Sequence, residues 1–178
     1  NGYLPAGTPY GEPEAGHEAG GTEEKIMITV LMATYQGRQY LEQQLDTILA
    51  QTVPVKILIS DDGSDDGTRE MLDNYAGWYP EQVVLHHRTE HTGGAAGNFF
   101  WLMQEALKDE KNEYILFSDQ DDVWENDKVS VMLHRMKVLE KGLGSACPIL
   151  LYSDMEVVDE ELYEISPSFA SYTHQDPD

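Results

Sequence analysis

Apolar runs of strand length alternate with segments of helical periodicity along most of the chain. Five apolar runs are continuous, as in strands buried on both faces, and they cover residues 26–33, 55–60, 82–87, 114–118 and 148–154. Four segments between them repeat apolar residues at helical spacing, over 39–52, 68–80, 93–107 and 127–140. This alternation predicts a doubly wound α/β domain with a mainly parallel sheet. A short hairpin is expected over 156–166.

Residues 1–25 lack this pattern. Gly, Pro, Ala and Glu dominate there, and no apolar periodicity is present. Such a composition cannot bury enough apolar surface to offset the entropy of ordering. We expect a disordered tail or cloning remnant, followed by one folded domain over 26–178.

The charge of the chain restricts its partners. It carries 33 acidic and 11 basic residues, a formal net charge of -22. That charge argues against broad binding to nucleic acid or to an anionic membrane surface. An anionic substrate would need a metal ion or a locally positive spot. The single cysteine, Cys147, excludes an internal disulfide, which suits a reducing cytoplasm. No apolar stretch has the length of a membrane span.

Three polar clusters directly follow predicted strands: "ATYQG" the first, "SDDGSDDG" the second and "SDQDDVW" the fourth. In open α/β sheets, ligands bind at the carboxyl ends of the strands. A shared site at this edge is therefore expected.

The cluster after the second strand partly matches a calcium-binding loop. Ser64 stands at the third position and Asp73 at the twelfth, where glutamate is usual, and an apolar strand precedes the loop instead of a helix. We therefore favour a turn in which Asp65, Asp66 and Gly67 supply caps and positive φ. A turn does not explain why Asp61 and Asp62 stand directly at the strand end.

The cluster after the fourth strand contains a candidate metal site. Asp119 and Asp121 are two apart, so on an extended segment their side chains point the same way. A hard ion such as Mg²⁺ is often held by one or two carboxylates plus substrate phosphates, and would join an acidic protein to a diphosphate. The alternative is an aspartate-rich helix start favoured by the helix dipole, which accounts for Asp127.

Other candidate features carry less weight. His86, His87 and His91 are expected to be loop histidines, because no cysteine or His-x3-His pair supports a metal site. The glycine-rich turn "GGAAGN" before a helix is, alone, weak support for phosphate binding.

Together the motifs resemble a known family. "ITVLMATYQGRQYLEQQLDTILAQT", "ILISDDGSDDGT" and "YILFSDQDDVWENDK" resemble the nucleotide-sugar half of family-two glycosyltransferases with the GT-A fold. "DQDDVW" followed by "LYSDMEVVDEELYEISPSF" is similar to the rhamnosyltransferase-like branch of bacterial cell-surface polysaccharide synthesis. The resemblance runs from Ile26 to about Phe169. It implies a Rossmann-like GT-A domain that stops before the acceptor half of a longer enzyme.

The resemblance also implies roles for single residues. Those matching nucleotide contacts are Thr34, Tyr35, Asp61, Asp62, Gly94, Asn98 and Asp119. Tyr35 would pack on the base with Thr34, and Asp62 would accept a hydrogen bond from the base imide. Asp119 and Asp121 match the DxD aspartates, whose ion (Mg²⁺ or Mn²⁺) binds the diphosphate. Asp122 and Trp124 would lie near the sugar.

The implied reaction is inverting transfer from a nucleoside-diphosphate sugar, either dTDP-rhamnose or a UDP-sugar, to a glycan or lipid-linked saccharide acceptor. In the family the catalytic base lies well after the DxD, and Asp154 is too close to it to be an easy substitute. We therefore expect the base to lie beyond Asp178, and this segment alone to be inactive without it.

The expected location is the cytoplasm, including the inner face of the membrane. Two alternatives stay open. One is a non-catalytic, metal-dependent nucleotide-binding module. The other is a sugar nucleotidyltransferase, whose loop after the first strand should be richer in glycine and basic residues.

Overall fold

The computed structural model describes residues 26–89, 91, 93–144 and 146–174. The predicted tail over 1–25 lies outside the described residues, so it stays a prediction.

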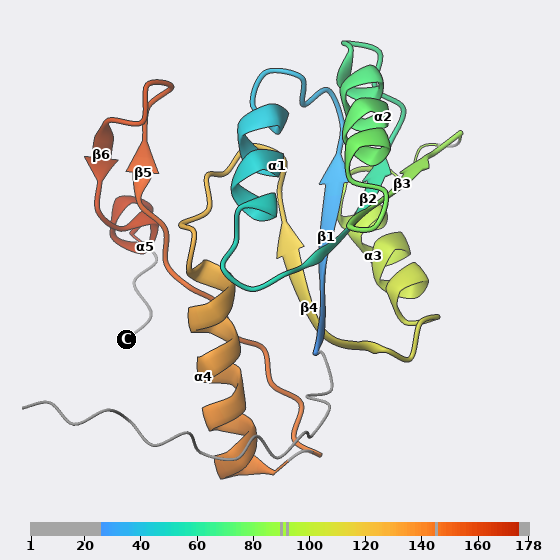
Figure 1. Ribbon diagram of the computed structural model, residues 1–178. Helices are drawn as coiled ribbons and strands as arrows, with labels where there is room; N and C mark the ends of the chain where they lie inside the picture. The colour runs from blue at the N-terminus through green and yellow to red at the C-terminus, as the bar shows by residue number, and fades with distance from the viewer. Residues whose placement is uncertain (1–25, 90, 92, 145, 175–178) are drawn as a thin grey trace, which may run out of the picture.

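Four parallel strands form the central sheet, in the order β3-β2-β1-β4 (Figure 1). Their bounds are β1 (Met27–Thr34), β2 (Lys56–Asp61), β3 (Val83–His87) and β4 (Asn112–Ser118). The first four predicted strands are therefore confirmed. Thr34 pairs with Asp61, and Asp61 pairs with His87, so the carboxyl ends of these strands lie level.

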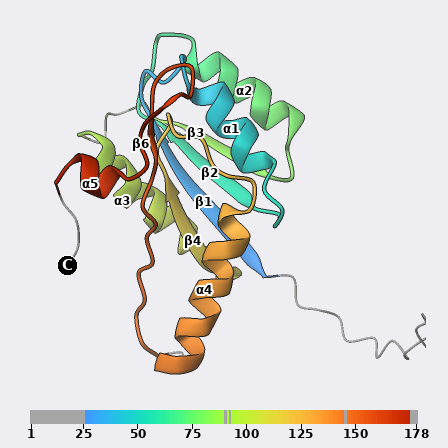
Figure 2. The same ribbon diagram turned by 90° about the vertical axis from the view of Figure 1, so that its left-hand side faces the viewer.

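Helices cover both faces of the sheet, as a doubly wound domain requires (Figure 2). They are α1 (Leu41–Leu49), α2 (Thr68–Trp78), α3 (Ala95–Ala106) and α4 (Lys128–Leu143). Val30 and Met32 of β1 point to the face covered by α1, α2 and the start of α4. Leu31 points to the opposite face, where it packs with Leu102 of α3. The core therefore lies in two layers, one on each side of β1.

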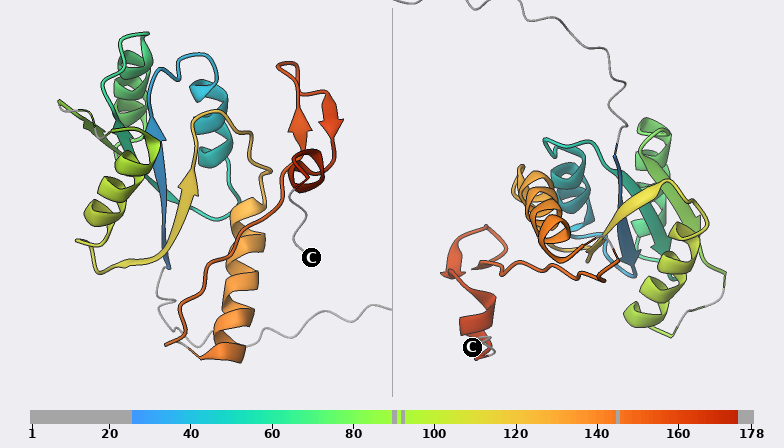
Figure 3. Two further views of the ribbon diagram at one scale, coloured as in Figure 1. Left: turned by 180° about the vertical axis from the view of Figure 1, so that it is seen from behind. Right: turned by 90° about the horizontal axis from the view of Figure 1, so that it is seen from below.

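The predicted fifth strand is wrong. Residues 148–154 form no strand, and Leu150 and Tyr152 are 82% and 74% exposed. The apolar run instead follows α4 back along its length (Figure 3), and it lines a gap together with Met132 and Met136 of that helix. A continuous apolar segment can pack against a helix with one face and leave the other face exposed. Sequence periodicity does not distinguish such a segment from a buried strand.

The predicted hairpin is confirmed by β5 (Val157–Val158) and β6 (Glu164–Ser166), which pair antiparallel and precede the short helix α5 (Phe169–Tyr172). This unit stands apart from the central sheet (Figures 1 and 3). Within the described part of the chain, no helix combines the length and apolar character needed to cross a bilayer.

Candidate functional site

A cleft of about 680 Å³ lies at the carboxyl ends of β1, β2 and β4, beside the start of α3. Loops distant in sequence meet there, and the lining residues are Ala33, Thr34, Tyr35, Asp62, His91, Gly93, Gly94, Ala95, Asn98, Asp119, Gln120 and Asp121. This set contains both residues predicted for the metal and every residue predicted for the nucleotide except Asp61. The strand-end position therefore brings together predicted site residues that are up to 87 positions apart in sequence, from 34 to 121.

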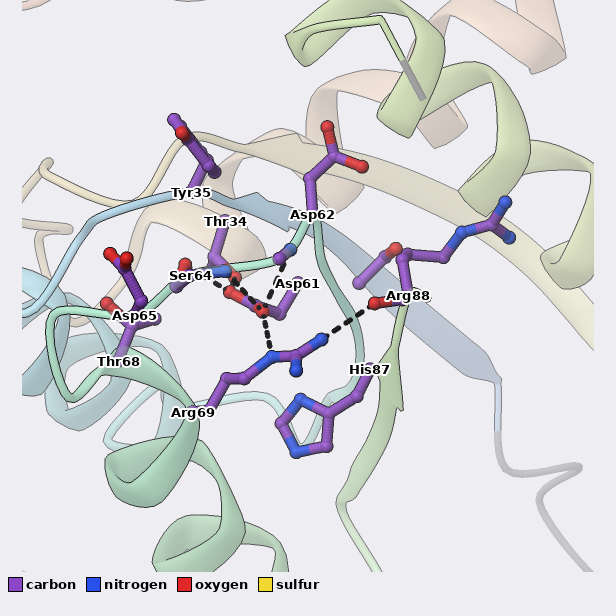
Figure 4. Close-up of polar contacts among 12 residues, drawn as sticks. Thr34, Tyr35, Asp61, Asp62, Ser64, Asp65, Thr68, Arg69, His87 and Arg88 are labelled. Carbon is purple, nitrogen blue, oxygen red and sulfur yellow. Dashed lines mark hydrogen bonds and ion pairs between the residues drawn. The ribbon is translucent and has the colours of Figure 1, made fainter. Parts of the chain in front are cut away.

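Asp61 and Asp62 are adjacent in sequence but point to opposite sides (Figure 4). Asp61 is fully buried beneath the cleft and forms an ion pair with Arg69, whose Nε lies 2.8 Å from Oδ2. It also accepts hydrogen bonds from the backbone N–H groups of Gly63 and Ser64, and from the Ser64 hydroxyl. Burial disfavours the charged form, yet these bonds together hold the pKa of Asp61 below its usual value.

Asp62 lies on the cleft side. The side chain of Asp62 points away from the Asp61–Arg69 pair (Figure 4), and Asp62 as a whole is only 6% exposed. One carboxylate oxygen, Oδ2, lies 3.9 Å from Nδ1 of His91. Asp62 N–H donates to the carbonyl of Thr34 at 2.9 Å, which ties the ends of β2 and β1 together. Asp62 therefore presents a carboxylate to the cleft from a fixed backbone position.

The loop after β1 is held by side chains from other loops. Each of four consecutive backbone N–H groups donates to such a side chain: Tyr35 to Gln120 Oε1, Gln36 to Ser64 Oγ, Gly37 to Thr68 Oγ1 and Arg38 to Asp66 Oδ2. Three of the four acceptors belong to the segment after β2. The cluster "SDDGSDDGT" therefore anchors the neighbouring loop, in addition to forming a turn with positive φ at Gly63 and Gly67.

The same contacts show that this segment is not a calcium-binding loop of the helix–loop–helix type. A strand precedes the segment, and Ser64 and Asp66 are engaged by the loop after β1. Asp73, the twelfth position of the sequence match, lies in α2 and pairs with His87 at 2.8 Å. Nowhere in the described ranges do three His, Cys, Asp or Glu side chains gather closely enough to hold a metal by themselves.

The carboxylates after β4 have different surroundings. Among the described residues, no hydrogen-bond donor contacts the carboxylates of Asp119, Asp121 or Asp122. Partial burial, and then the charge of Asp121, raise the pKa of Asp119 above its usual value. Burial, Asp119 and Asp121 raise the pKa of Asp122, while Lys128 opposes the rise. Ionised, these groups repel one another, so they suit a hard cation that takes its remaining ligands from phosphate and water.

A smaller cavity of about 220 Å³ adjoins the cleft at Asp119, and it contains the two residues predicted near the sugar, Asp122 and Trp124. Lys128 also lines it, and its Nζ lies 4.9 Å from the centroid of the Trp124 ring. Ser153 and Met155 of the C-terminal segment close another side. Asp119 is thus shared by two cavities that differ in size.

The start of α3 adds a polar group to the cleft. Gly93 and Gly94 both have positive φ, with open space where a Cβ would stand, so glycine is favoured there by conformation. Asn98 is 2% exposed and donates from Nδ2 to the carbonyl of Ser60 at 2.9 Å. Its Oδ1 is buried and has no hydrogen-bond partner in the described part of the chain. Asn98 thus holds a buried acceptor without a partner among the described residues at the edge of the cleft that it lines.

The catalytic base stays unassigned. Asp178 lies outside the described residues, so the expectation that the base follows it stays a prediction. Asp154, set aside on sequence grounds, lines neither the cleft nor the smaller cavity. One of its carboxylate oxygens, Oδ1, accepts from the backbone N–H groups of Met155 and Ala170, at 2.9 and 3.2 Å. Asp154 therefore ties together the C-terminal unit and faces neither cavity.

Two residues of the cleft escape prediction from the sequence. His91 is a loop histidine as expected, whereas His86 and His87 belong to β3 and not to a loop. The sequence did not predict that the His91 ring lies 6.1 Å from that of Tyr35, edge to face. This ring also lies over Gly63, where a Cβ would stand 2.9 Å from His91 Cε1. Nothing in the local pattern signals this position. Gln120 does have a signal, because it stands between the two DxD aspartates.

The sequence of this chain matches a known family over most of its length. Residues 29–173 match the sequence profile described as "Glycosyl transferase family 2". The chain belongs to this family. The predicted family is therefore confirmed.

Two curated relatives are informative. The chain is 39% identical to dTDP-rhamnosyl transferase RfbG of Shigella flexneri over 55% of this chain and 34% of that protein. It is 31% identical to the putative teichuronic acid biosynthesis glycosyltransferase TuaG of Bacillus subtilis, over 65% of this chain and 44% of that protein. The chain thus spans between a third and a half of these relatives.

Solved structures confirm the GT-A fold. TarS 1–349 of S. aureus in complex with UDP superposes with a TM-score of 0.52 at 18% identity, covering 63% of this chain and 32% of that one. The mannosyltransferase PcManGT of Pyrobaculum calidifontis, in complex with GDP-Man and Mn²⁺, gives a TM-score of 0.50 at 25% identity, covering 60% and 31%.

Proposed function

We propose that this chain is the donor-binding part of an inverting, metal-dependent glycosyltransferase, and that its cleft binds a nucleoside-diphosphate sugar. The observation that carries the proposal is the meeting of Asp62, Asn98, Asp119 and Asp121 in one cleft at the carboxyl ends of the strands. In a family 2 chain, this edge is where a donor is expected.

The nucleotide base of the donor would lie between the loop after β1 and the start of α3. The Asp62 carboxylate can only accept hydrogen bonds when ionised, so it suits the imide N–H of uracil or thymine. Tyr35 offers a half-exposed ring for the base, and Asn98 Oδ1 a buried acceptor for a ribose hydroxyl. These preferences favour a UDP-sugar or dTDP-rhamnose, and the name of the Shigella relative supports the second. Asp61 would support Asp62 from below, because its own carboxylate faces Arg69.

Asp119 and Asp121 would hold Mg²⁺ or Mn²⁺, and the presence of Mn²⁺ with GDP-Man in PcManGT supports this assignment. When bound, the ion would offset negative charge on the leaving diphosphate. The chain itself carries a net charge of -22, so its carboxylates repel a diphosphate without a cation. Asp122 and Trp124 would contact the sugar from the smaller cavity.

The acceptor would be a growing cell-surface polysaccharide or another glycan, free or lipid-linked, reached from the cytoplasm or the inner face of the membrane. The name of TuaG, which refers to teichuronic acid biosynthesis, supports a polysaccharide acceptor. We assign no catalytic base, since no described carboxylate outside the proposed nucleotide, metal and sugar contacts lines either cavity.

Calorimetry of uridine and thymidine diphosphates, with Mn²⁺ and then with EDTA, tests this function. We expect Mn²⁺ to raise nucleotide affinity about 5- to 150-fold, because carboxylates and phosphates become ligands of one ion. Asp121→Asn should remove most of that gain, since an amide oxygen is neutral and a poorer ligand. Asp65→Asn, in the exposed turn, is the matched control and should retain it. Equal affinities with and without Mn²⁺ would refute the metal role.

Two other functions separate from this one by experiment. A non-catalytic nucleotide-binding module would show the same metal-coupled binding, but the full-length protein would release no nucleoside diphosphate from a sugar donor. A sugar nucleotidyltransferase needs free backbone N–H groups after β1 to cradle phosphates. In this loop all four N–H groups from Tyr35 to Arg38 already donate to side chains, which disfavours that activity.

A further inference from the structure

Gln120 makes an unusual pair of contacts across the cleft floor. It stands between the two DxD aspartates, but its side chain reaches the loop after β1. Its Oε1 accepts from the backbone N–H of Tyr35 at 2.9 Å, and its Nε2 donates to the carbonyl of Tyr35 at 3.0 Å. One amide thus satisfies both backbone polar groups of a single residue 85 positions away.

Gly37 provides the space for this contact. A Cβ on Gly37 would lie 2.3 Å from Oε1 of Gln120 and 2.6 Å from its Cδ, far inside normal contact distance. Gly37 is not among the glycines with positive φ, so what requires glycine here is room and not conformation. The amide of Gln120 therefore rests against a surface that only glycine leaves open.

The contact restrains the aspartates on both sides of Gln120. Asp119 and Asp121 are bonded to it through the backbone, so a fixed Gln120 limits how far either can move. On the side before Asp119, the Ser118 hydroxyl donates to the Asp119 carbonyl at 2.8 Å and accepts from Gln44 Nε2 at 2.6 Å. When both are ionised, the carboxylates of Asp119 and Asp121 repel each other. The segment is thus held at Ser118, before the first aspartate, and at Gln120, between the two.

We infer that Gln120 is a positioning residue: it locks the loop that carries Asp119 and Asp121 to the loop that carries Tyr35. The inference rests on the proposed function, because it assigns the first loop to the metal and diphosphate and the second to the base. Because the contact fixes the distance between the two loops, the groups for the diphosphate and those for the nucleotide base are already correctly spaced before the donor binds.

A double-mutant cycle tests the lock, with the ratio of nucleotide affinities in Mn²⁺ and in EDTA as the readout. Gln120→Ala should lower this ratio by about 2- to 30-fold. Gly37→Ala should also lower it, although Gly37 does not line the cleft, because the new Cβ displaces the amide. The double variant should be no worse than Gln120→Ala alone, because no amide remains to be displaced.

Gln36→Ala is the matched control. Gln36 also bridges through both ends of its amide, donating from Nε2 to Asp65 Oδ1 and accepting from Asp65 N–H, but it does not reach the metal loop. It should lower the melting temperature without changing the affinity ratio, which separates positioning from stability.

The outcomes distinguish the two claims. If the wild-type protein shows no Mn²⁺-dependent gain for uridine or thymidine diphosphate, the proposed function fails and this inference fails with it. If the wild-type gain is present and Gln120→Ala keeps it, or if the effects of Gly37→Ala and Gln120→Ala add in the double variant, only the lock is refuted. A lowered ratio in both single variants without additivity would establish it.

Discussion

The aspartates after β2 and those after β4 lie on either side of β1, and the two groups have opposite surroundings. Asp61 and Asp66 accept several hydrogen bonds each, and although burial opposes ionisation, these bonds hold both pKa values below the usual one. Asp119 and Asp122 have raised pKa values, caused first by burial and then by their neighbours' charges. Asp61 and Asp66 therefore help to hold the loops around the cleft in place, whereas the carboxylates of Asp119 and Asp122 accept no hydrogen bond from a donor in the described part of the chain.

Asp61→Ala should have the largest effect on stability. It would leave Arg69 and two backbone N–H groups without their buried acceptor. We expect a loss of about 3 kcal/mol, at the low end for a broken buried ion pair because Arg69 is partly exposed. Urea unfolding followed by circular dichroism measures it. Asp65→Asn, at an exposed position of the same turn, should change stability by less than about 0.5 kcal/mol. Equal effects of the two variants would show that Asp61 does not help to hold these loops in place.

The two groups should also respond to pH with opposite signs. The folded pKa of Asp61 is depressed, so its contribution is full above the unfolded value of 3.8 and is lost as pH falls through the folded pKa. The folded pKa of Asp119 is raised, so its contribution is present below 3.8 and is lost as pH rises through the folded pKa. In EDTA, Asp119→Asn should therefore gain stability over wild type as pH rises from 3.8, whereas Asp61→Asn should approach wild type as pH falls below it. If the stability difference from wild type changed with pH in the same direction for both variants, this assignment would be contradicted.

Replacing both DxD aspartates should raise stability slightly when no metal is present. Asp119→Asn with Asp121→Asn removes a like-charge repulsion, which we expect to add about 0.5 kcal/mol in EDTA because Asp121 is exposed. Adding Mn²⁺ with nucleotide should raise the melting temperature of wild type and leave the double variant unchanged. A destabilised double variant in EDTA would show instead that these carboxylates help to hold the loops in place.

Asp73→Asn should have the smallest effect. Its hydrogen bond with His87 joins side chains that are 64% (Asp73) and 31% (His87) exposed, so water competes with it. We expect a change below about 0.5 kcal/mol in urea unfolding. A larger loss would mean that surface acids in this protein share the role of Asp61.

The sequence was sufficient for the four strands of the central sheet, and most of the residues that it predicted for the site line one cleft. The apolar runs predicted β1 to β4 because strands buried on both faces leave a clear pattern. It was not sufficient to tell which of Asp61 and Asp62 faces the cleft, since β2 is buried on both faces and its pattern does not alternate. The error at 148–154 has the same origin, because an apolar run does not state what it packs against.

Local sequence patterns do not predict contacts between residues that are far apart in the chain. His91 meets Tyr35 across 56 positions (35 to 91), and Gln120 meets Tyr35 across 85. The local sequence gives no signal for His91, and for Gln120 it shows only the flanking aspartates and not the contact with Tyr35. Only the parallel sheet, which brings the ends of β1, β2 and β4 together, creates their roles.

The four anchored N–H groups after β1 have a consequence for the order of folding. Their acceptors lie 28 to 85 residues further along the chain, so no local event can shape this loop. Closing such long segments is slow, because chain entropy is lost before the favourable interactions form. During synthesis, β1 to β3 can assemble before Gln120 has left the ribosome, but the loop cannot take its final form until then. Nucleotide binding should therefore appear later in refolding than the far-ultraviolet signal of the sheet and helices.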